Sequence, residues 1–108
     1  MAKKQTVISV SVEDDGDFHY RPSVKKLKAG ESVTWTCDQG PFAISFKERT
    51  PFGRTNLHST KAKDGKSWTV NSVLPKNPER GHFHYAVAIS TGEKVYLDAG
   101  CPEVIVET

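Results

Sequence analysis

Two histidines separated by one residue are the clearest candidates for chemistry in this sequence. His82 and His84 lie in the run GHFHYAVAIS, and a β-strand directs side chains i and i+2 to the same face. Neighbouring imidazoles can bind Zn²⁺, Ni²⁺ or Cu²⁺, but a closed zinc site usually has four ligands. His19 is the other histidine in a predicted strand, and nothing in the sequence places it near this pair. We therefore expect solvent-facing polar residues and no metal or other cofactor, with His82, His84 and Cys101 as candidate ligands if a metal does bind.

The two cysteines leave three interpretations open. Cys37 alternates with Val33 and Trp35 and so shares their face, and Cys101 lies in a loop expected at the same end of the molecule. The pair could form a disulfide, which requires Cα atoms within about 7 Å of each other. They could instead be buried, inert thiols, because free cysteine behaves as a small hydrophobic residue. The third interpretation is a redox or metal-binding role, although neither cysteine belongs to a Cys-x-x-Cys motif.

Alternation of polar and apolar residues predicts an all-β fold. Apolar side chains recur at every second position in six segments, which is the pattern of strands with one buried face. These segments are TVISVSVE, SVTWTC, FAISF, SWTVNSV, HFHYAVAI and EVIVE. Turn residues separate them, around Gly16, Gly30, Gly40, Gly65 and Gly92. Seven or eight short strands with frequent turns indicate an antiparallel β-sandwich or barrel.

The same alternation predicts which side chains form the core. In HFHYAVAI the apolar positions would face inward, and the two histidines would then face outward. We expect most of the aromatic residues in the core, namely Trp35, Trp68, Phe42, Phe46, Phe83 and Tyr85.

Length and charge exclude several classes of protein. A chain of 108 residues fits one domain, residues 1–108. The net charge of +2 is too small to indicate a nucleic-acid or membrane partner, and the lysines of Lys25–Lys28 are expected on an edge strand. No apolar run approaches the ~20 residues of a membrane-spanning helix. The N-terminus lacks the apolar run of a signal peptide, so the chain as given is expected to be cytoplasmic; a periplasmic or exported location is the alternative if such a peptide was removed.

No sequence signature of an enzyme is present, and we expect no catalytic activity. The chain has no Gly-x-Ser-x-Gly, phosphate-loop, His-Glu-x-x-His or paired-carboxylate motif. Glu13–Asp15 precede Gly16 and are expected in a solvated turn. The polar stretch Lys47–Lys66 is weakly patterned and long for an inert loop, so we expect it to be mobile or to hold a short helix.

The order and spacing of the segments resemble the cupredoxins, the plastocyanin-like proteins. The first half, VEDDGDFHYRPSVKKLKAGESVTWTCDQGPFAISF, is similar to the family's acidic turn, proline and Val-x-Trp/Phe strand. The second half, GHFHYAVAIS followed by DAGCPEVIVE, looks like the family's Gly-x-Tyr-x-Phe-x-Cys strand, its Gly-Met loop and its last strand. The resemblance spans nearly the whole chain and implies a Greek-key β-sandwich.

The resemblance also locates the positions at which the family binds copper. The first histidine falls on Phe42, or on Ala43 if the register shifts by one residue, and the cysteine thiolate falls on Val87. The second histidine falls on Ser90, and the axial methionine falls at or near Cys101. A blue-copper site needs two imidazoles and a thiolate, which phenylalanine and valine cannot replace. The resemblance therefore implies the fold without the electron-transfer chemistry of the family.

These observations lead to a non-catalytic binding or interaction module as the expected function. The loops Gly40–Phe42, Thr50–Lys66 and Ser90–Cys101, at the end of the former metal pocket, would bind a partner. An apolar tip there would dock another protein, and it would consist of Pro41, Phe42, Pro51 and Phe52. The alternative is a metal-handling or redox protein that uses Cys37 and Cys101, or His82 and His84. The sequence predicts no oligomeric state.

Overall fold

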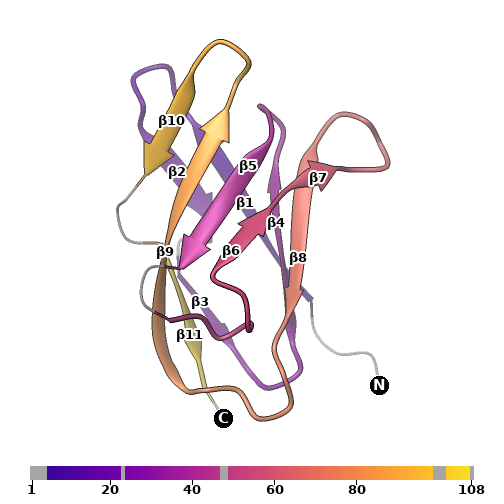
Figure 1. Cartoon of the computed structure of the whole chain (residues 1–108), viewed down its shortest axis with the longest axis vertical. Helices are drawn as coiled ribbons and strands as arrows, with labels where there is room; N and C mark the ends of the chain where they lie inside the picture. The colour runs from indigo at the N-terminus through magenta and orange to yellow at the C-terminus, as the bar shows by residue number, and fades with distance from the viewer. Residues whose placement is uncertain (1–4, 23, 47–48, 99–101, 108) are drawn as a thin grey trace.

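The computed structural model describes residues 5–22, 24–46, 49–98 and 102–107, which form eleven strands in two sheets packed face to face (Figure 1). The strands are β1 (Gln5–Val12), β2 (Phe18–Arg21), β3 (Val24–Leu27), β4 (Ser32–Cys37), β5 (Phe42–Phe46), β6 (Asn56–His58), β7 (Thr60–Lys61), β8 (Trp68–Val73), β9 (Gly81–Ser90), β10 (Val95–Asp98) and β11 (Glu103–Val106). The expected all-β sandwich is confirmed. The expected seven to eight strands are too few, because β6, β7 and β10 are short strands that alternation does not mark clearly.

The first sheet has the order β2-β1-β4-β8-β7, and the second has the order β3-β11-β9-β5-β6. Strand β10 also belongs to the second sheet, where it pairs with the second half of β9. Most neighbours are antiparallel, as expected, but β1 runs parallel to β4 and β3 runs parallel to β11. The expected antiparallel pairing therefore holds for most neighbouring strands, but both sheets are mixed. Alternation could not reveal this difference, because it reports which face is buried and not the direction of the neighbouring strand.

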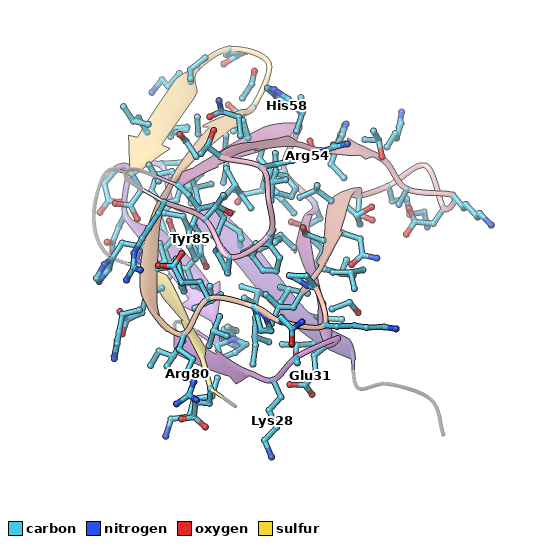
Figure 2. The ribbon with its side chains drawn as sticks, turned by 60° about the horizontal axis from the view of Figure 1, so that its bottom comes forward. Lys28, Glu31, Arg54, His58, Arg80 and Tyr85 are labelled. Carbon is cyan, nitrogen blue, oxygen red and sulfur yellow. The ribbon has the colours of Figure 1, made fainter. Side chains whose placement is uncertain are left out.

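The core lies where the sequence predicts it. Trp35 and Tyr85 are fully buried, and the indole Nε1 of Trp35 donates a hydrogen bond of 3.2 Å to the Tyr85 hydroxyl. Tyr85 lies in the middle of the molecule, away from the labelled charged side chains at the lower end (Figure 2). The ring of Phe46 packs against Tyr85, and the ring of Phe52 packs edge-on against Trp35. Trp68 is the exception among the predicted core aromatics, because it is half-buried at the margin of the core.

The polar stretch after β5 contains strands where a short helix was one expectation. Strand β6 pairs with β5 in the second sheet, and β7 pairs with β8 in the first sheet. This stretch therefore crosses from one sheet to the other. The short strands were missed because only Leu57 marks a buried position in them. Residues 47 and 48, at the start of the stretch, lie outside the described part of the chain.

One edge of the sandwich carries exposed lysines, and another is closed by a hydrogen bond between the two sheets. Strand β3 is an edge strand, as the lysine run predicts, and Lys26 and Lys28 are exposed there. At another edge, the Tyr20 hydroxyl donates a hydrogen bond of 2.6 Å to Asp98 Oδ2. Because Tyr20 lies on β2 and Asp98 on β10, this bond ties the first sheet to the second. Among the described residues, no helix is long and apolar enough to cross a membrane.

Candidate functional site

The described positions that the resemblance assigns to copper ligands lie along the paired strands β5 and β9. Strands β5 and β9 are paired so that Phe42 lies opposite Ile89 and Ile44 lies opposite Val87. Phe42 and Val87 are both buried, and the backbone N–H of Ser90 donates to the carbonyl of Pro41 at 2.9 Å. The phenyl and isopropyl groups fill this space and carry no donor atom. These residues do not fit a blue-copper centre, and Ala43 on the neighbouring register offers no donor either.

A tight turn closes this end of the molecule. The buried Gly40 lies so close to β9 that a Cβ atom built on it would be 1.8 Å from the carbonyl oxygen of Ser90. The side-chain amide of Gln39 pairs with the backbone of Val12, accepting from its N–H and donating to its carbonyl at 2.7 Å each. The turn between β4 and β5 is therefore held against both sheets, by a close backbone approach on one side and a side-chain amide on the other.

Cys37 is buried at the end of β4 and has no disulfide partner within the described part of the chain. Burial raises the pKa of this thiol, and backbone hydrogen bonds from Gln39 and Gly40 only partly oppose the effect. This environment corresponds to the inert-thiol interpretation, since the thiolate is the reactive form. Cys101 lies outside the described residues, so its part in a disulfide, a metal site or the former pocket stays a prediction.

We expect Cys37 to react with thiol reagents only when the protein unfolds. A Cys101→Ser variant isolates this thiol, and its rate of modification by a chromogenic disulfide reagent is compared with the rate of global unfolding measured by tryptophan fluorescence. Equal rates are expected, because burial hides the sulfur and raises its pKa. Rapid modification of the native protein would show that Cys37 is accessible and available for redox chemistry.

The apolar tip expected from the sequence does not form one exposed patch. Phe42 and Pro51 are buried, and only Pro41 among the four residues is exposed. Phe52 packs against Trp35 and Phe46, near the opposite end of β5 from Phe42. The tip was predicted because both Pro-Phe dipeptides lie in loops next to β5. The structure instead uses their rings to cover the core.

A different apolar surface lies on the outer face of the second sheet. One row of paired residues runs across four strands, from Leu97 on β10 through Ala88 and Ala43 to His58 on β6. Leu97 is 70% exposed, and Val95 on the same strand is 74% exposed. The alanines between the flanking strands leave shallow hollows of about 290 and 100 Å³. We call this surface the alanine face and define it as Ala43, Ala86, Ala88, Val95 and Leu97.

The two histidines of GHFHYAVAIS lie further along the same outer face. They point away from the core, as predicted, and share a carboxylate that the sequence reasoning missed. Glu103 Oε2 lies 3.4 Å from His82 Nδ1 and 3.0 Å from His84 Nε2. Strand β11 brings Glu103 there, because it pairs with β9 so that Glu103 lies directly opposite His84. The outward position of Glu103 follows from alternation in EVIVE, but this pairing is not visible in the sequence.

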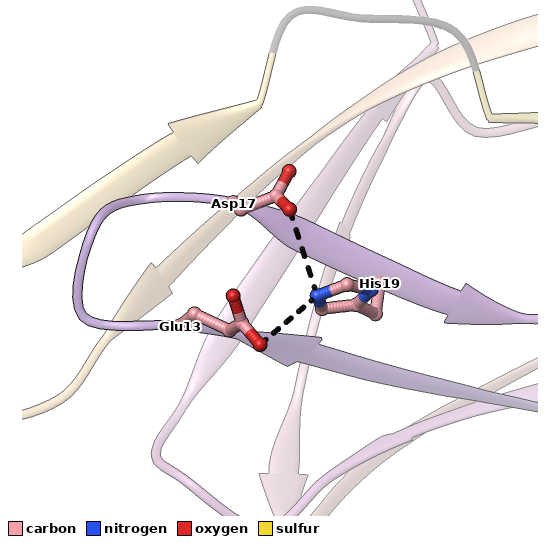
Figure 3. A group of neighbouring side chains, drawn as sticks. All are labelled: Glu13, Asp17 and His19. Carbon is pink, nitrogen blue, oxygen red and sulfur yellow. Dashed lines mark ion pairs between the residues drawn. The ribbon is translucent and has the colours of Figure 1, made fainter.

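A second cluster, of Glu13, Asp17 and His19, lies at the turn between β1 and β2 (Figure 3). His19 Nε2 is 3.5 Å from Glu13 Oε1 and 3.7 Å from Asp17 Oδ2. All three side chains are exposed, and the turn carries further acidic residues that are also exposed. The expectation of a solvated acidic turn is confirmed. Solvent and salt screen such exposed pairs, so their contribution to stability is small.

Comparisons with known proteins find similarity at the level of solved structures. No family model matches the chain, and no curated protein matches it. Pseudoazurin from Hyphomicrobium denitrificans is 17% identical, with a TM-score of 0.49, and the alignment covers 97% of this chain and 77% of pseudoazurin. Plastocyanin from Dryopteris crassirhizoma is 16% identical, with a TM-score of 0.46, and the alignment covers 94% of this chain and 100% of plastocyanin. Both are cupredoxins, the family that the sequence resembles.

Proposed function

We propose that this protein is a non-catalytic binding module and that the alanine face is its binding surface. The observation that carries this proposal is the exposure of two large aliphatic side chains, Leu97 and Val95, beside a row of small residues. Water contacts most of the surface of both side chains, and covering them with a partner would remove that apolar area from water. The surface borders the Gly40–Phe42 turn and Ser90. It therefore adjoins the end of the molecule at which the sequence predicts that a partner binds.

The partner that fits this surface is a second copy of the chain. The alanine face has a ridge, formed by Val95 and Leu97, directly beside a depression over Ala43 and Ala88. A two-fold axis through such a surface places the ridge of each copy over the depression of the other. This arrangement of ridge and depression supports self-association as the mode of binding.

The charge of the alanine face also favours self-association. None of the residues that line its two hollows is Lys, Arg, Asp or Glu, although these types make up 26% of the chain. In a two-fold contact identical residues approach one another, so a charged surface would bring like charges together. A surface without these four residue types avoids most of that repulsion, and His58 is the titratable residue that lines both hollows.

The environments of the titratable groups support a role in binding more than one in catalysis. Among the described residues with a shifted pKa, burial raises the pKa of Tyr20, Tyr85 and Cys37 and so favours their protonated forms. The exposed Asp64 has a lowered pKa because it accepts hydrogen bonds from the backbone N–H groups of Lys66 and Ser67 in a turn. Each shift follows from packing or turn geometry and makes neither a nucleophile nor a general base near neutral pH.

Analytical ultracentrifugation over a range of protein concentrations tests the proposal. We expect concentration-dependent dimers, and we expect Leu97→Lys to weaken self-association at least about tenfold because it puts two like charges in the contact. Val7→Lys and Val73→Lys are the matched controls, since these valines are 52% and 56% exposed on strands of the first sheet. A monomer at every concentration, or dimers that only the control variants weaken, would contradict the second copy as the partner.

A further inference from the structure

We infer that His82, His84 and Glu103 form a binding site for a divalent first-row transition-metal ion. This site lies outside the alanine face and is independent of the proposed function. Two imidazoles and one carboxylate are a donor set that proteins use for zinc and for non-haem iron, with the remaining positions open to water or a ligand. The three residues project from β9 and β11 on the outer face of the second sheet.

The distances from the Glu103 carboxylate to each of the two imidazoles match the ligand spacing around a metal ion. Zinc lies 2.0–2.2 Å from histidine nitrogen and carboxylate oxygen, which places neighbouring ligands of a tetrahedral shell about 3.4 Å apart. Glu103 Oε2 lies 3.4 Å from His82 Nδ1 and 3.0 Å from His84 Nε2. The carboxylate oxygen is therefore at ligand spacing from both imidazoles. The imidazole nitrogens themselves lie further apart, because among the described residues the three donors that all come within 4.8 Å of one another belong to Glu13, Asp17 and His19. Binding of one ion therefore requires the two exposed rings to turn toward each other.

The carboxylate is held more firmly than the imidazoles. The side chain of Glu103 is only 17% exposed, whereas those of His82 and His84 are 63% and 51% exposed. Glu103 is also fixed by the sheet, because β11 pairs with β9 on one side and with β3 on the other. A recessed carboxylate below two exposed rings gives a site that opens to solvent. An ion bound there would have three protein ligands and would face solvent.

Two described cations near this part of the second sheet already have carboxylate partners. Lys26 Nζ, on β3, lies 3.6 Å from Glu107 Oε1, and Arg49 pairs with Glu79. These cations already have carboxylate partners of their own. Protons are the competitors that matter, because a metal binds the deprotonated imidazole and its affinity falls as the pH is lowered.

The cluster at the turn between β1 and β2 serves as a comparison for the metal-binding site within the same molecule. Glu13, Asp17 and His19 offer one imidazole and two carboxylates, and all three are exposed on a hairpin turn. Such a set lacks the second imidazole that favours zinc, nickel and copper over calcium and magnesium. Both clusters contain a histidine beside carboxylate, so substitutions in one control for substitutions in the other.

Titration of the full chain with Zn²⁺ tests the inference. Isothermal titration calorimetry is carried out on a Cys101→Ser, Leu97→Lys background, so that neither the Cys101 thiol nor a dimer contact contributes and the remaining thiol, Cys37, is buried. We expect one ion per chain, with NMR shifts of the His82 and His84 imidazoles. We also expect His84→Gln and Glu103→Gln each to weaken binding at least about tenfold, as loss of one of three ligands requires.

The controls are His58→Gln, a histidine outside both clusters, and His19→Gln. Both should leave the affinity for Zn²⁺ unchanged, and circular dichroism should show that every variant is folded. Unchanged affinity in His84→Gln and Glu103→Gln would overturn the inference, as would loss of binding in His19→Gln alone. The inference would also be overturned if no heat and no imidazole shift were observed up to millimolar Zn²⁺.

Discussion

Replacing Gly40 by alanine is expected to destabilise the protein by at least about 3 kcal/mol, or to prevent folding. The added Cβ would lie 1.8 Å from the Ser90 carbonyl oxygen and 3.0 Å from its carbonyl carbon. Both atoms belong to the backbone of β9, and Ser90 is held by a hydrogen bond to Pro41. The strand therefore cannot move away without breaking its pairing, and urea denaturation of the purified variant measures the cost.

Gly65→Ala is the matched control for this change. Gly65 has a φ of +71° and nothing within 4 Å of its Cβ position, so its cost arises from backbone conformation alone. We expect about 1 kcal/mol for placing alanine in the left-handed region. If Gly40→Ala cost no more than Gly65→Ala, the close approach of the turn to β9 would not exist in solution.

Stability is expected to fall steeply as the pH rises above about 10. Burial raises the pKa of Tyr85 from its ordinary value of 10.0 to about 12, against a smaller lowering by the hydrogen bond from Trp35. Between these values the unfolded chain has lost the phenol proton and the folded chain keeps it, so stability decreases with rising pH. The contribution is fully present below pH 10 and is lost by about pH 12. It amounts to roughly 3 kcal/mol, since one pKa unit corresponds to about 1.36 kcal/mol.

Tyr20 should act in the same direction. Burial raises its pKa first, and the hydrogen bond to Asp98 and the charge of that carboxylate raise it further. Urea denaturation at a series of pH values, with tyrosinate absorbance of the native protein, measures both effects. Tyr85→Phe is expected to be less stable at neutral pH, because Trp35 Nε1 loses its acceptor, but to lose less stability between pH 10 and 12. Equal pH slopes for the wild type and this variant would refute the assignment to Tyr85.

The faces of the strands could be predicted from the sequence, because burial repeats every second residue. Phe83, Tyr85, Val87 and Ile89 are all buried, as alternation predicts, and His82 and His84, at the alternate positions, are exposed. The turns around glycine were predicted for an equally local reason, since glycine accepts the positive φ found at Gly16, Gly30, Gly65 and Gly92. Each of these predictions needs only neighbouring residues.

The candidate sites depended on which strands pair, and alternation does not contain that information. Glu103 meets His84 only because β11 returns beside the first half of β9. The alanine face likewise needs β10 beside Ala88 and β6 beside Ala43, and both strands are too short to be recognised from their pattern. The apolar tip was predicted from adjacency in the sequence and is absent because its rings turn inward.

Strand β9 limits which changes of sequence this protein tolerates, because it buries one face along its whole length. Its ten residues carry core side chains on one face, with alanines and histidines on the other. Removal of one residue from its middle would invert every side chain on one side of the deletion. If the first half of the strand is inverted, the histidines enter the core and Phe83 becomes exposed to water. If the second half is inverted, Ala88 enters the core and Ile89 becomes exposed. Outer-face residues of β9 can therefore be exchanged individually, but the length of the strand cannot vary by a single residue.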